Sequence, residues 1–217
     1  LAAVGSAYTL MVFLISILLG LSMGSGTVFS LQYGAGDLSA LRRSIYVSLL
    51  LIGTVTILLN VAVFLWLDPI LRWLQVPYDI YSLMRNYLWI IFWGIVFTFL
   101  YNFYAALLRA VGDSVTPLWF LAVSVVLNIG LDLFLILVLD QGIEGAAVAT
   151  VIAQGTAASG ILLYTYKTRP ELRLHREDMC FDRSSLREIT SFSTLTCVQQ
   201  SVMNFGILMV QGLVNSF

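Results

Sequence analysis

Hydrophobic residues occur in long runs along the chain, and polar and charged residues gather in the short stretches between them. Each of six runs is long enough to cross the bilayer core, which takes about 20 apolar residues in a helix. Because lipid offers the backbone no hydrogen-bonding partners, runs of this kind must be helical. The pattern predicts six transmembrane helices, at residues 8–31, 45–67, 81–108, 117–139, 143–166 and 186–217.

Composition supports the same class of protein. Hydrophobic residues make up 59% of the chain and charged residues 11%, and the mean hydropathy is +0.93, which is typical of a polytopic membrane protein. A formal net charge of -1 provides no basic surface for nucleic acid, so the expected partner is the lipid bilayer. Cys180 and Cys197 show no paired or metal-binding spacing and are interpreted as free thiols.

Basic residues predict the orientation. All Lys and Arg residues except Arg72 and Arg85 lie in or beside three connections, at residues 32–44, 109–116 and 167–185. Short loops rich in Lys and Arg stay in the cytoplasm, so we expect these connections on the inner side of the cytoplasmic membrane. The first helix then runs inward, and no Met opens the chain, so we expect a fragment that lacks a preceding helix.

The connection at residues 167–185 is the only long one. It predicts a division into two units, residues 1–166 and residues 186–217. Leu172 and Leu174 within it could rest on the membrane surface, but its many charges favour a solvated loop.

Small residues recur at helical spacing in two predicted helices. Gly20 and Gly24 are four apart in the first, and Ala149, Ala153 and Ala157 follow the same spacing in the fifth. This spacing lets helix backbones approach closely in a membrane, so these residues predict packing and no chemistry.

An acidic residue inside the fourth hydrophobic run is the main functional candidate. A carboxylate such as Asp132 costs at least about 2.5–3.5 kcal/mol to insert in hydrocarbon, so it is by default a functional-site hypothesis. Asn128 lies four residues earlier on the same helical face, where both side chains can hold one small ion. The alternative is a structural carboxylate paired with a neighbouring hydroxyl.

Two more polar residues are predicted at a similar depth. Asp132 lies about seven residues, roughly 10 Å, below the outer end of its helix. Thr150 and Tyr87 lie at nearly the same depth in the fifth and third helices. The set predicts a cation or proton site, with Asp132 as the titrating group and Tyr87 as a hydrogen-bond partner. Asn128 and Thr150 would supply oxygen ligands, and Na+ is one candidate ion at Asp132 and Asn128.

The last predicted helix carries uncharged amides on one face, namely Gln200, Asn204 and Gln211. Such a stripe suits the wall of a cavity that meets varied substrates, and it suits helix-to-helix hydrogen bonding equally well. Both interpretations stay open. Asn102 and Gln154 are weaker candidates for the same cavity, since packing explains them as well.

The string GAGD at residues 34–37 matches the signature around one catalytic aspartate of GxGD intramembrane proteases. That chemistry needs two carboxylates at close range. Asp37 is expected at the cytoplasmic rim and Asp132 in the outer half of the membrane. The string is therefore better interpreted as a glycine-rich turn with Asp37 near the start of the next helix.

Five segments together resemble the multidrug and toxic compound extrusion (MATE) family, in its order and with its loop lengths. They are LAAVGSA (1–7), SLQYGAGD (30–37), ALLRAVGDSVTPLWF (106–120), LNIGLDLFLI (127–136) and GIEGAAVATVIAQ (142–154).

The resemblance implies an all-α transmembrane bundle of twelve helices in two six-helix lobes. This chain would supply the second to sixth helices of the first lobe, the cytoplasmic interlobe loop and the first helix of the second lobe. It also implies export of small organic, often cationic compounds in exchange for Na+ or H+, with no other cofactor and no enzymatic reaction.

In family members with a first-lobe cation site, the fifth helix carries an Asn and, four residues later, an Asp, which match Asn128 and Asp132. A sixth-helix threonine and a fourth-helix tyrosine match Thr150 and Tyr87. The sequence departs from the pattern at two points. The aspartate that the family places on its first helix is not in this chain, and Gln199 and Gln200 stand where some members carry a second-lobe carboxylate.

We therefore expect a cation-coupled efflux antiporter of unassigned oligomeric state. The alternative is a lipid-linked oligosaccharide flippase of the same superfamily. Such flippases usually have a more basic cavity, and no Lys or Arg lies in the middle of a predicted helix here, which favours drug export.

Overall fold

The computed structural model describes residues 2–73, 78–178 and 180–214, with the backbone alone at the outer ends of the first and last helices and at a few single positions. Within these ranges the chain is helical and contains no strand, which confirms the predicted all-α fold. The long helices are α1 (Ala2–Gly34), α2 (Leu38–Trp73), α3 (Tyr78–Ala110), α4 (Val115–Leu133), α5 (Gly142–Thr168) and α6 (Arg183–Val214). Three short helices are η1 (Phe134–Val138), η2 (Pro170–Leu172) and η3 (Arg176–Asp178).

Stretches long and apolar enough to cross a membrane occur in α1 to α5, so the chain is a multi-pass membrane protein. The described part of α6 is interrupted by hydroxyl and amide side chains and does not join this set. The α4 span is unusual because 6% of its most apolar window is buried within the bundle. Large side chains such as Trp119 and Val126 project outward from it, at 68% and 71% exposure, as expected of a helix facing lipid.

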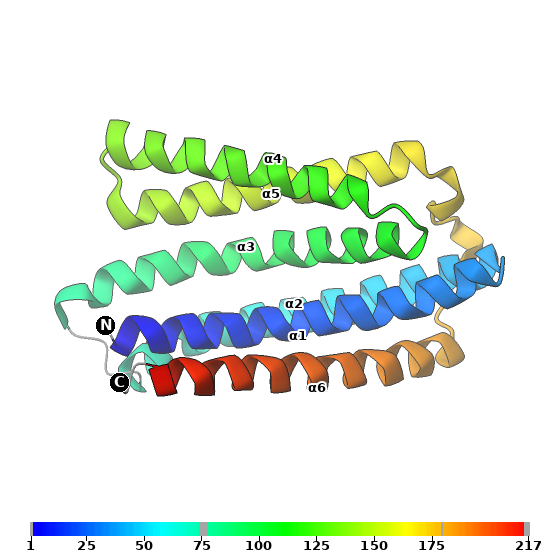
Figure 1. Ribbon diagram of the computed structural model, residues 1–217, viewed down its shortest axis with the longest axis horizontal. Coiled ribbons are helices and arrows are strands. Elements are labelled where there is room, and N and C mark those ends of the chain that lie inside the picture. Colours follow the sequence, from blue (N-terminus) through cyan, green and yellow to red (C-terminus); the bar gives the residue numbers. More distant parts are fainter. Residues whose placement is uncertain (1, 74–77, 179, 215–217) are drawn as a thin grey trace.

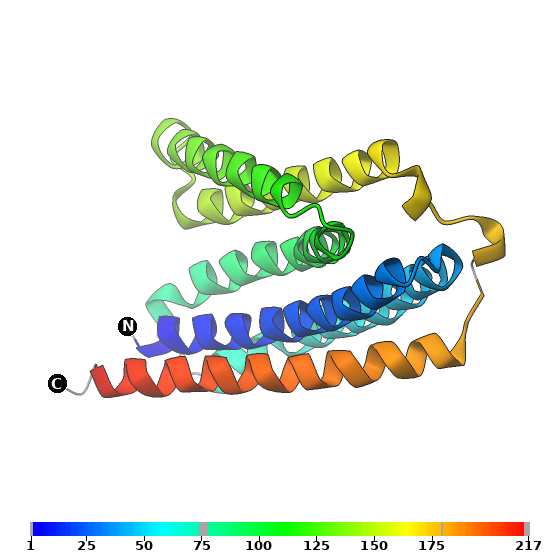
Figure 2. The same cartoon turned by 45° about the vertical axis from the view of Figure 1, so that its right-hand side comes forward.

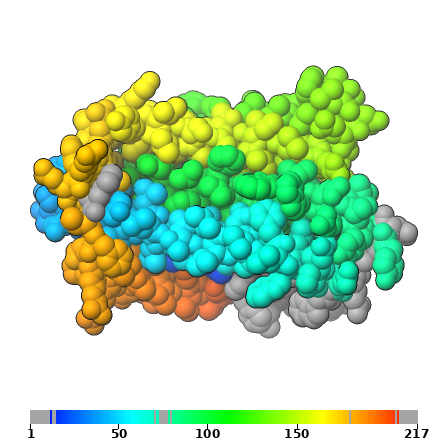
Figure 3. Space-filling view, turned by 180° about the vertical axis from the view of Figure 1, so that it is seen from behind, coloured from blue at the N-terminus to red at the C-terminus, as the bar shows by residue number. Residues whose placement is uncertain are grey.

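The helices form a layered bundle (Figures 1 and 2). The helix α4 packs on α5, α5 on α3, α3 on α1, and α1 on α6, while α2 packs against both α1 and α3. From the opposite side, α2 covers the middle of the molecule between α5 and α6 (Figure 3). Because α5 lies between α3 and α4, the α4–α5 hairpin forms one edge of the bundle and α6 forms the other.

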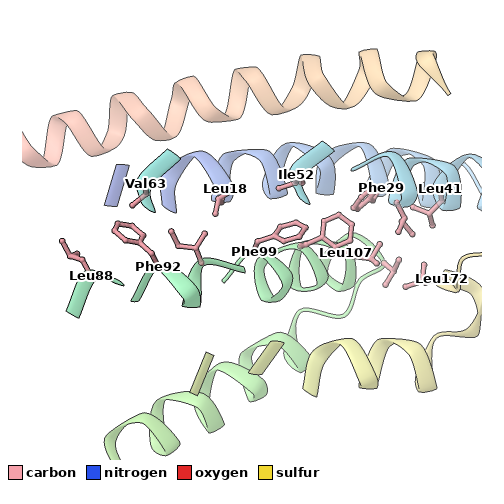
Figure 4. Close-up of a cluster of buried hydrophobic side chains, with 14 of the residues drawn as sticks. Leu18, Phe29, Leu41, Ile52, Val63, Leu88, Phe92, Phe99, Leu107 and Leu172 are labelled. Carbon is pink, nitrogen blue, oxygen red and sulfur yellow. The ribbon is translucent and has the colours of Figure 1, made fainter. Parts of the chain in front are cut away.

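Large apolar side chains fill the space between α1, α2 and α3 in one continuous row (Figure 4). Phe29 and Phe103 are fully buried and meet edge to face, with their ring centroids 5.9 Å apart. This row runs along the bundle from Leu88 at one end to Leu172 at the other (Figure 4). It holds these three helices together as a unit.

The turn between α1 and α2 is stabilised by a glycine and a carboxylate. Gly36 has a φ of 75°, which a residue with a Cβ rarely adopts. Asp37 follows it and accepts a hydrogen bond from the backbone N–H of Ala40 at 2.9 Å. Asp37 is therefore a helix cap in the predicted turn, which agrees with the structural interpretation of the GAGD string.

A second capped turn joins α3 to α4, with Gly112 at a φ of 90°. Asp113 accepts hydrogen bonds from the backbone N–H and the hydroxyl of Thr116, at 3.0 and 2.8 Å. Partial burial raises the pKa of Asp113, but the two Thr116 bonds and the Arg169 guanidinium together hold it below its ordinary value. The carboxylate therefore stays charged at the start of α4.

The prediction that residues 167–185 form a solvated loop is wrong for its first part. Leu172, in η2, is 5% exposed and belongs to the apolar row between α1, α2 and α3 (Figure 4). Leu174 packs against the same cluster. The leucines can be buried because charged side chains around them are paired with charges on neighbouring elements, as Arg169 is with Asp113 and Asp178 with Arg42.

Candidate functional site

Small and hydroxyl side chains bring α4 and α5 together. Ala149 and Ala153 of α5 are 0% and 2% exposed. The buried Ser124 hydroxyl on α4 donates a hydrogen bond to the Ala153 carbonyl at 2.9 Å. This contact confirms the predicted packing role of these alanines and fixes the rotation of α4, so that the face carrying Asn128 turns toward α5.

The structure places Asn128 beside Thr150, as the comparison of depths predicted. The Asn128 Nδ2 donates to the Thr150 Oγ1 at 3.4 Å, a long hydrogen bond. The Thr150 hydroxyl donates its own hydrogen to the Ala146 carbonyl at 2.9 Å. The Oδ1 of Asn128 and a lone pair of Thr150 are thus acceptors that can serve a small cation.

Asp132 lies one turn further along α4 and is half-buried. Its Oδ1 is buried and has no hydrogen-bond partner among the described residues. A buried acceptor with no partner carries a desolvation cost of about 1–3 kcal/mol, and more when it is charged. A bound cation or proton would remove that cost, so the residues present fit such a ligand.

The helix changes form just after Asp132. The sequence predicts a continuous helix to residue 139, but α4 ends at Leu133 and one π-turn, η1, follows it. Its backbone bond runs from the Leu139 N–H to the Phe134 carbonyl, 3.2 Å away. Asp140 then has a φ of 52° and Gly142 a φ of 56°. A π-turn such as η1 occurs mostly as a single insertion in an α-helix, frequently at a functional site.

No hydrogen bond among the described residues links Tyr87 to Asn128, Asp132 or Thr150. It lies on α3, half-buried, and packs against the apolar row of the α1–α2–α3 core. The helix α5 stands between α3 and α4 (Figures 1 and 2). The structure therefore brings Asn128 and Thr150 into contact on the α4–α5 hairpin, with Asp132 one turn further along α4, and places Tyr87 against the core.

A second feature is a groove of about 650 Å³ between α1 and α3. Asn102, predicted for the substrate cavity, lines it and donates to the Thr98 carbonyl at 2.7 Å, which leaves its Oδ1 as an acceptor. Ser22 also lines the groove, is 1% exposed and has an Oγ without a partner. Met23 and Ala106 supply apolar surface. Sequence patterns missed Ser22, since a single serine in an apolar run gives no signal.

The other predicted cavity residues take part in contacts between helices. Gln154 on α5 accepts a hydrogen bond from the Thr98 hydroxyl at 3.0 Å. On α6, Gln200 donates to the Sδ of Met23 at 3.3 Å and Asn204 donates to the hydroxyl of Ser16. Gln200 reaches the edge of the groove through Met23. Gln211 lies outside the residues whose side chains are described.

The contact between α1 and α6 is close because of the glycines predicted to pack. A Cβ added to Gly20 would lie 2.7 Å from the Cα of Cys197, and one added to Gly24 would meet Ser193. The Ser193 hydroxyl donates to the Leu21 carbonyl at 3.3 Å. Small residues therefore confirm the packing prediction, and Gln200 and Asn204 of α6 bond across the same contact.

Comparison with known proteins gives consistent results. A protein-family model described as MatE matches residues 1–134. The chain is 35% identical over 216 residues to the probable multidrug resistance protein YpnP of Bacillus subtilis, a match that covers 100% of this chain and 48% of that protein. It is 29% identical over 197 residues to the probable multidrug resistance protein NorM of Thermotoga maritima, covering 89% of this chain and 42% of that one. The chain thus spans about half the length of these curated relatives.

Solved structures show the same fold. A crystal structure of MATE in complex with MaL6 superposes with a TM-score of 0.90 at 21% identity, covering 97% of this chain and 47% of that one. The outward-facing conformation of a multidrug resistance MATE family transporter superposes with a TM-score of 0.87 at 22% identity, covering 96% and 46%.

Proposed function

This chain belongs to the MatE family, and we propose that it forms part of a secondary active transporter that exports small organic compounds in exchange for Na+ or H+ across the cytoplasmic membrane. In this proposal α1 to α5 belong to the first lobe and α6 opens the second. Multidrug resistance proteins among the relatives support the substrate class.

The observation that carries the proposal is the buried, unpartnered Oδ1 of Asp132 on α4, one helical turn after the Asn128 that bonds to Thr150. One carboxylate with amide and hydroxyl oxygens suits a monovalent cation or a proton. Among the described residues no three His, Cys, Asp or Glu side chains gather where they could hold a metal ion. This donor set therefore favours ion coupling over multivalent metal binding.

Charge neutralisation at Asp132 provides the coupling step. An ionised carboxylate favours a state in which water reaches it, and a neutralised one favours a state in which water is excluded. Binding of the ion thus changes the relative free energy of the two states, which is the requirement for alternating access. The α4–α5 hairpin transmits the change because Asn128 and Thr150 link its two helices.

The groove between α1 and α3 is the proposed substrate-binding surface. Its volume of about 650 Å³ falls in the range of ordinary small-molecule sites, which combine apolar walls with a few polar groups. The polar groups here come from Ser22, Thr27, Ser30, Asn102 and Arg109.

The test uses the full-length transporter in vesicles, with efflux of a fluorescent organic cation driven by either a Na+ or a proton gradient. Asp132→Asn is expected to abolish efflux under whichever gradient drives the unmodified protein. Asp140→Asn is the matched control, because it removes a carboxylate from the loop after the same helix and should leave efflux unchanged. Full efflux by Asp132→Asn contradicts the site.

The flippase alternative predicts a different outcome in the same vesicles. A flippase would leave the organic cation in place under both gradients while moving a lipid-linked oligosaccharide. Absence of gradient-driven efflux by the unmodified protein would therefore overturn the antiporter proposal.

A second experiment tests the groove. Asn102→Ala should raise the substrate concentration for half-maximal efflux, because it removes an acceptor from the wall. Gln154→Ala is the comparison, since Gln154 bonds to Thr98 between α3 and α5 and should affect stability rather than substrate affinity.

A further inference from the structure

We propose that residues 169–178 are a fixed part of the first lobe, docked on its cytoplasmic face, and that this docking leaves a short tether to the second lobe. The segment, here called the strap, connects α5 to α6. In Figures 2 and 3 it folds across the end of the bundle instead of extending away from it.

An apolar anchor holds the middle of the strap. Leu172 is 5% exposed and shares its cluster with Leu41 of α2 and Leu107 of α3. Its backbone N–H donates to the Arg169 carbonyl at 3.0 Å, which closes the η2 turn. The buried leucine therefore closes the cytoplasmic end of the apolar row between α1, α2 and α3.

A polar cluster holds the end of the strap to α2. The Nε of Arg42 lies 3.4 Å from the Oδ2 of Asp178. The same oxygen accepts the backbone N–H of His175 at 3.2 Å, and the Nη1 of Arg42 lies 3.3 Å from the His175 Nδ1. The Asp178 side chain is 13% exposed, so this ion pair is screened less than a surface pair.

Three further contacts hold the first half of the strap. The Nη2 of Arg169 lies 3.7 Å from the Oδ2 of Asp113, in the turn between α3 and α4. Arg173 donates from its Nε to the Tyr166 carbonyl at 2.8 Å, and its guanidinium carbon lies 4.6 Å from the centre of the Tyr166 ring. The strap thus bonds to α2, to the α3–α4 turn and to α5, all of which belong to the first lobe.

Docking shortens the free connection between the lobes. Only residues 179–182 separate the docked Asp178 from the start of α6 at Arg183. At about 3.3–3.6 Å per residue, this length lets the two points part by roughly 17 Å. If residues 169–178 were free, the limit would be roughly 50 Å. The docked strap therefore keeps the cytoplasmic end of α6 close to the first lobe, and this consequence rests on the proposed function.

Limited trypsin digestion of the full-length protein in inside-out vesicles tests the docking. The bond after Arg173 should resist trypsin in the unmodified protein, because Leu172 is buried and Arg173 is bonded to Tyr166. Relative to the rate at the same bond in the denatured protein, which corrects for the new Asp beside the cleavage site, Leu172→Asp should be cut there at least about tenfold faster, since cleavage follows the population of the undocked form. Asp178→Asn should give a smaller increase at the same bond.

Matched variants separate docking from general damage. Phe181→Asp makes the same kind of change at a residue of the same connection that is 65% exposed, and Glu177→Gln changes an exposed neighbour of Asp178. Both should leave the rate of cleavage after Arg173 unchanged. If Leu172→Asp is cut no faster than the unmodified protein, docking is disproved. If Leu172→Asp does not yield monodisperse protein, Asp178→Asn alone decides, and an unchanged rate contradicts docking.

Efflux in the same vesicles tests the tether. Leu172→Asp should lower gradient-driven efflux several-fold per mole of protein, while Phe181→Asp should retain it. If Leu172→Asp is cut faster but retains full efflux, the strap is docked as proposed, but the short connection to α6 is not needed for transport. An unmodified protein with no efflux under either gradient would instead overturn the proposed antiport, and the cleavage result would still decide the docking.

Discussion

The α1–α2–α3 core and the α4–α5 hairpin differ in how their buried polar side chains are hydrogen-bonded. In the core, the Thr56 hydroxyl donates to the Ile52 carbonyl at 2.7 Å, and the amide of Asn60 donates to the Phe92 carbonyl at 2.8 Å. In the hairpin, the Oδ1 of Asp132 is buried with no partner among the described residues. The proposed ion site accounts for this difference, because a bound cation or proton would supply the partner that the Asp132 carboxylate lacks.

Buried serines do not remove this contrast. Ser22 of α1 and Ser44 and Ser48 of α2 also have hydroxyls without a hydrogen-bond partner, and at the turn between these helices the Oε1 of Gln32 and the Nε of Arg42 also lack one. A serine hydroxyl is neutral and can rotate toward the carbonyl one turn earlier in its own helix. A carboxylate in a membrane has no such local solution, so Asp132 has the higher cost.

Side-chain size differs between the regions as well. Phe29, Phe92 and Phe103 fill the core at 0–1% exposure, whereas the buried residue bonded across the hairpin, at its carbonyl, is the small Ala153. Large side chains interlock and resist displacement, while small ones let two helices shift against each other at modest cost. The hairpin is therefore better suited to respond to an ion.

The largest effect is expected from Phe103→Ala. This ring is fully buried and packs against Phe29 and Phe99 at centroid distances of 5.9 and 6.0 Å. Its removal should lower the free energy of unfolding by about 3–5 kcal/mol. Denaturant unfolding in detergent measures this, with Phe134→Ala, at a residue 49% exposed, as the control. A loss below about 1 kcal/mol would contradict the assignment of the core.

A smaller loss is expected from Asn60→Ala. The change leaves the Phe92 carbonyl without the side-chain donor that bridges α2 and α3. The unfolding free energy should fall by about 1–3 kcal/mol. Asn86→Ala removes an exposed amide bonded to Glu144 and should change it little. Equal losses of unfolding free energy in the two variants would show that burial does not determine how much these hydrogen bonds stabilise the protein.

The fold follows from the sequence because each membrane helix must satisfy its own backbone. Within the described residues each of the six predicted runs is helical, and the small residues Gly20 and Gly24 lie at a close helix contact as predicted. The strap was not predictable in this way. The burial of Leu172 depends on a space between α2 and α3 that exists only after the helices have packed.

The candidate site was predictable to the extent that helical geometry alone determines which side chains lie together. Asn128 and Asp132 share a face because of their spacing, and depth along antiparallel neighbours placed Thr150 beside Asn128. Depth does not determine which helix faces which, so it gave no way to place Tyr87, which lies against the core. The π-turn after Asp132 has no local sequence signal in the apolar run Phe134–Val138.

The unsatisfied carboxylate gives the sharpest test of the comparison, because Asp132→Leu should raise stability while abolishing efflux. Removal of a buried charge without a partner should increase the free energy of unfolding by about 1–2 kcal/mol. Asp68→Leu is the control, because Asp68 accepts bonds from Tyr81 and Arg85 at 3.0 and 2.9 Å and should not stabilise when removed. A lower unfolding free energy for Asp132→Leu would show that its carboxylate is structural.

The smallest effect is local and concerns Asp182, a carboxylate with every partner that Asp132 lacks. It accepts the hydroxyls of Ser185 and Ser184, each at 2.7 Å, and the backbone N–H groups of both residues. These bonds, led by that from the Ser185 hydroxyl, lower the pKa of Asp182 below its ordinary value. A lowered pKa means that the cap is fully formed above the unfolded value of about 3.9 and is lost as the pH falls through the lower folded value. Amide hydrogen exchange in the first turn of α6, corrected for intrinsic rates, should therefore rise on acidification below about pH 4, whereas Asp182→Asn should lack this dependence. The same acid response in both proteins would assign it to another group.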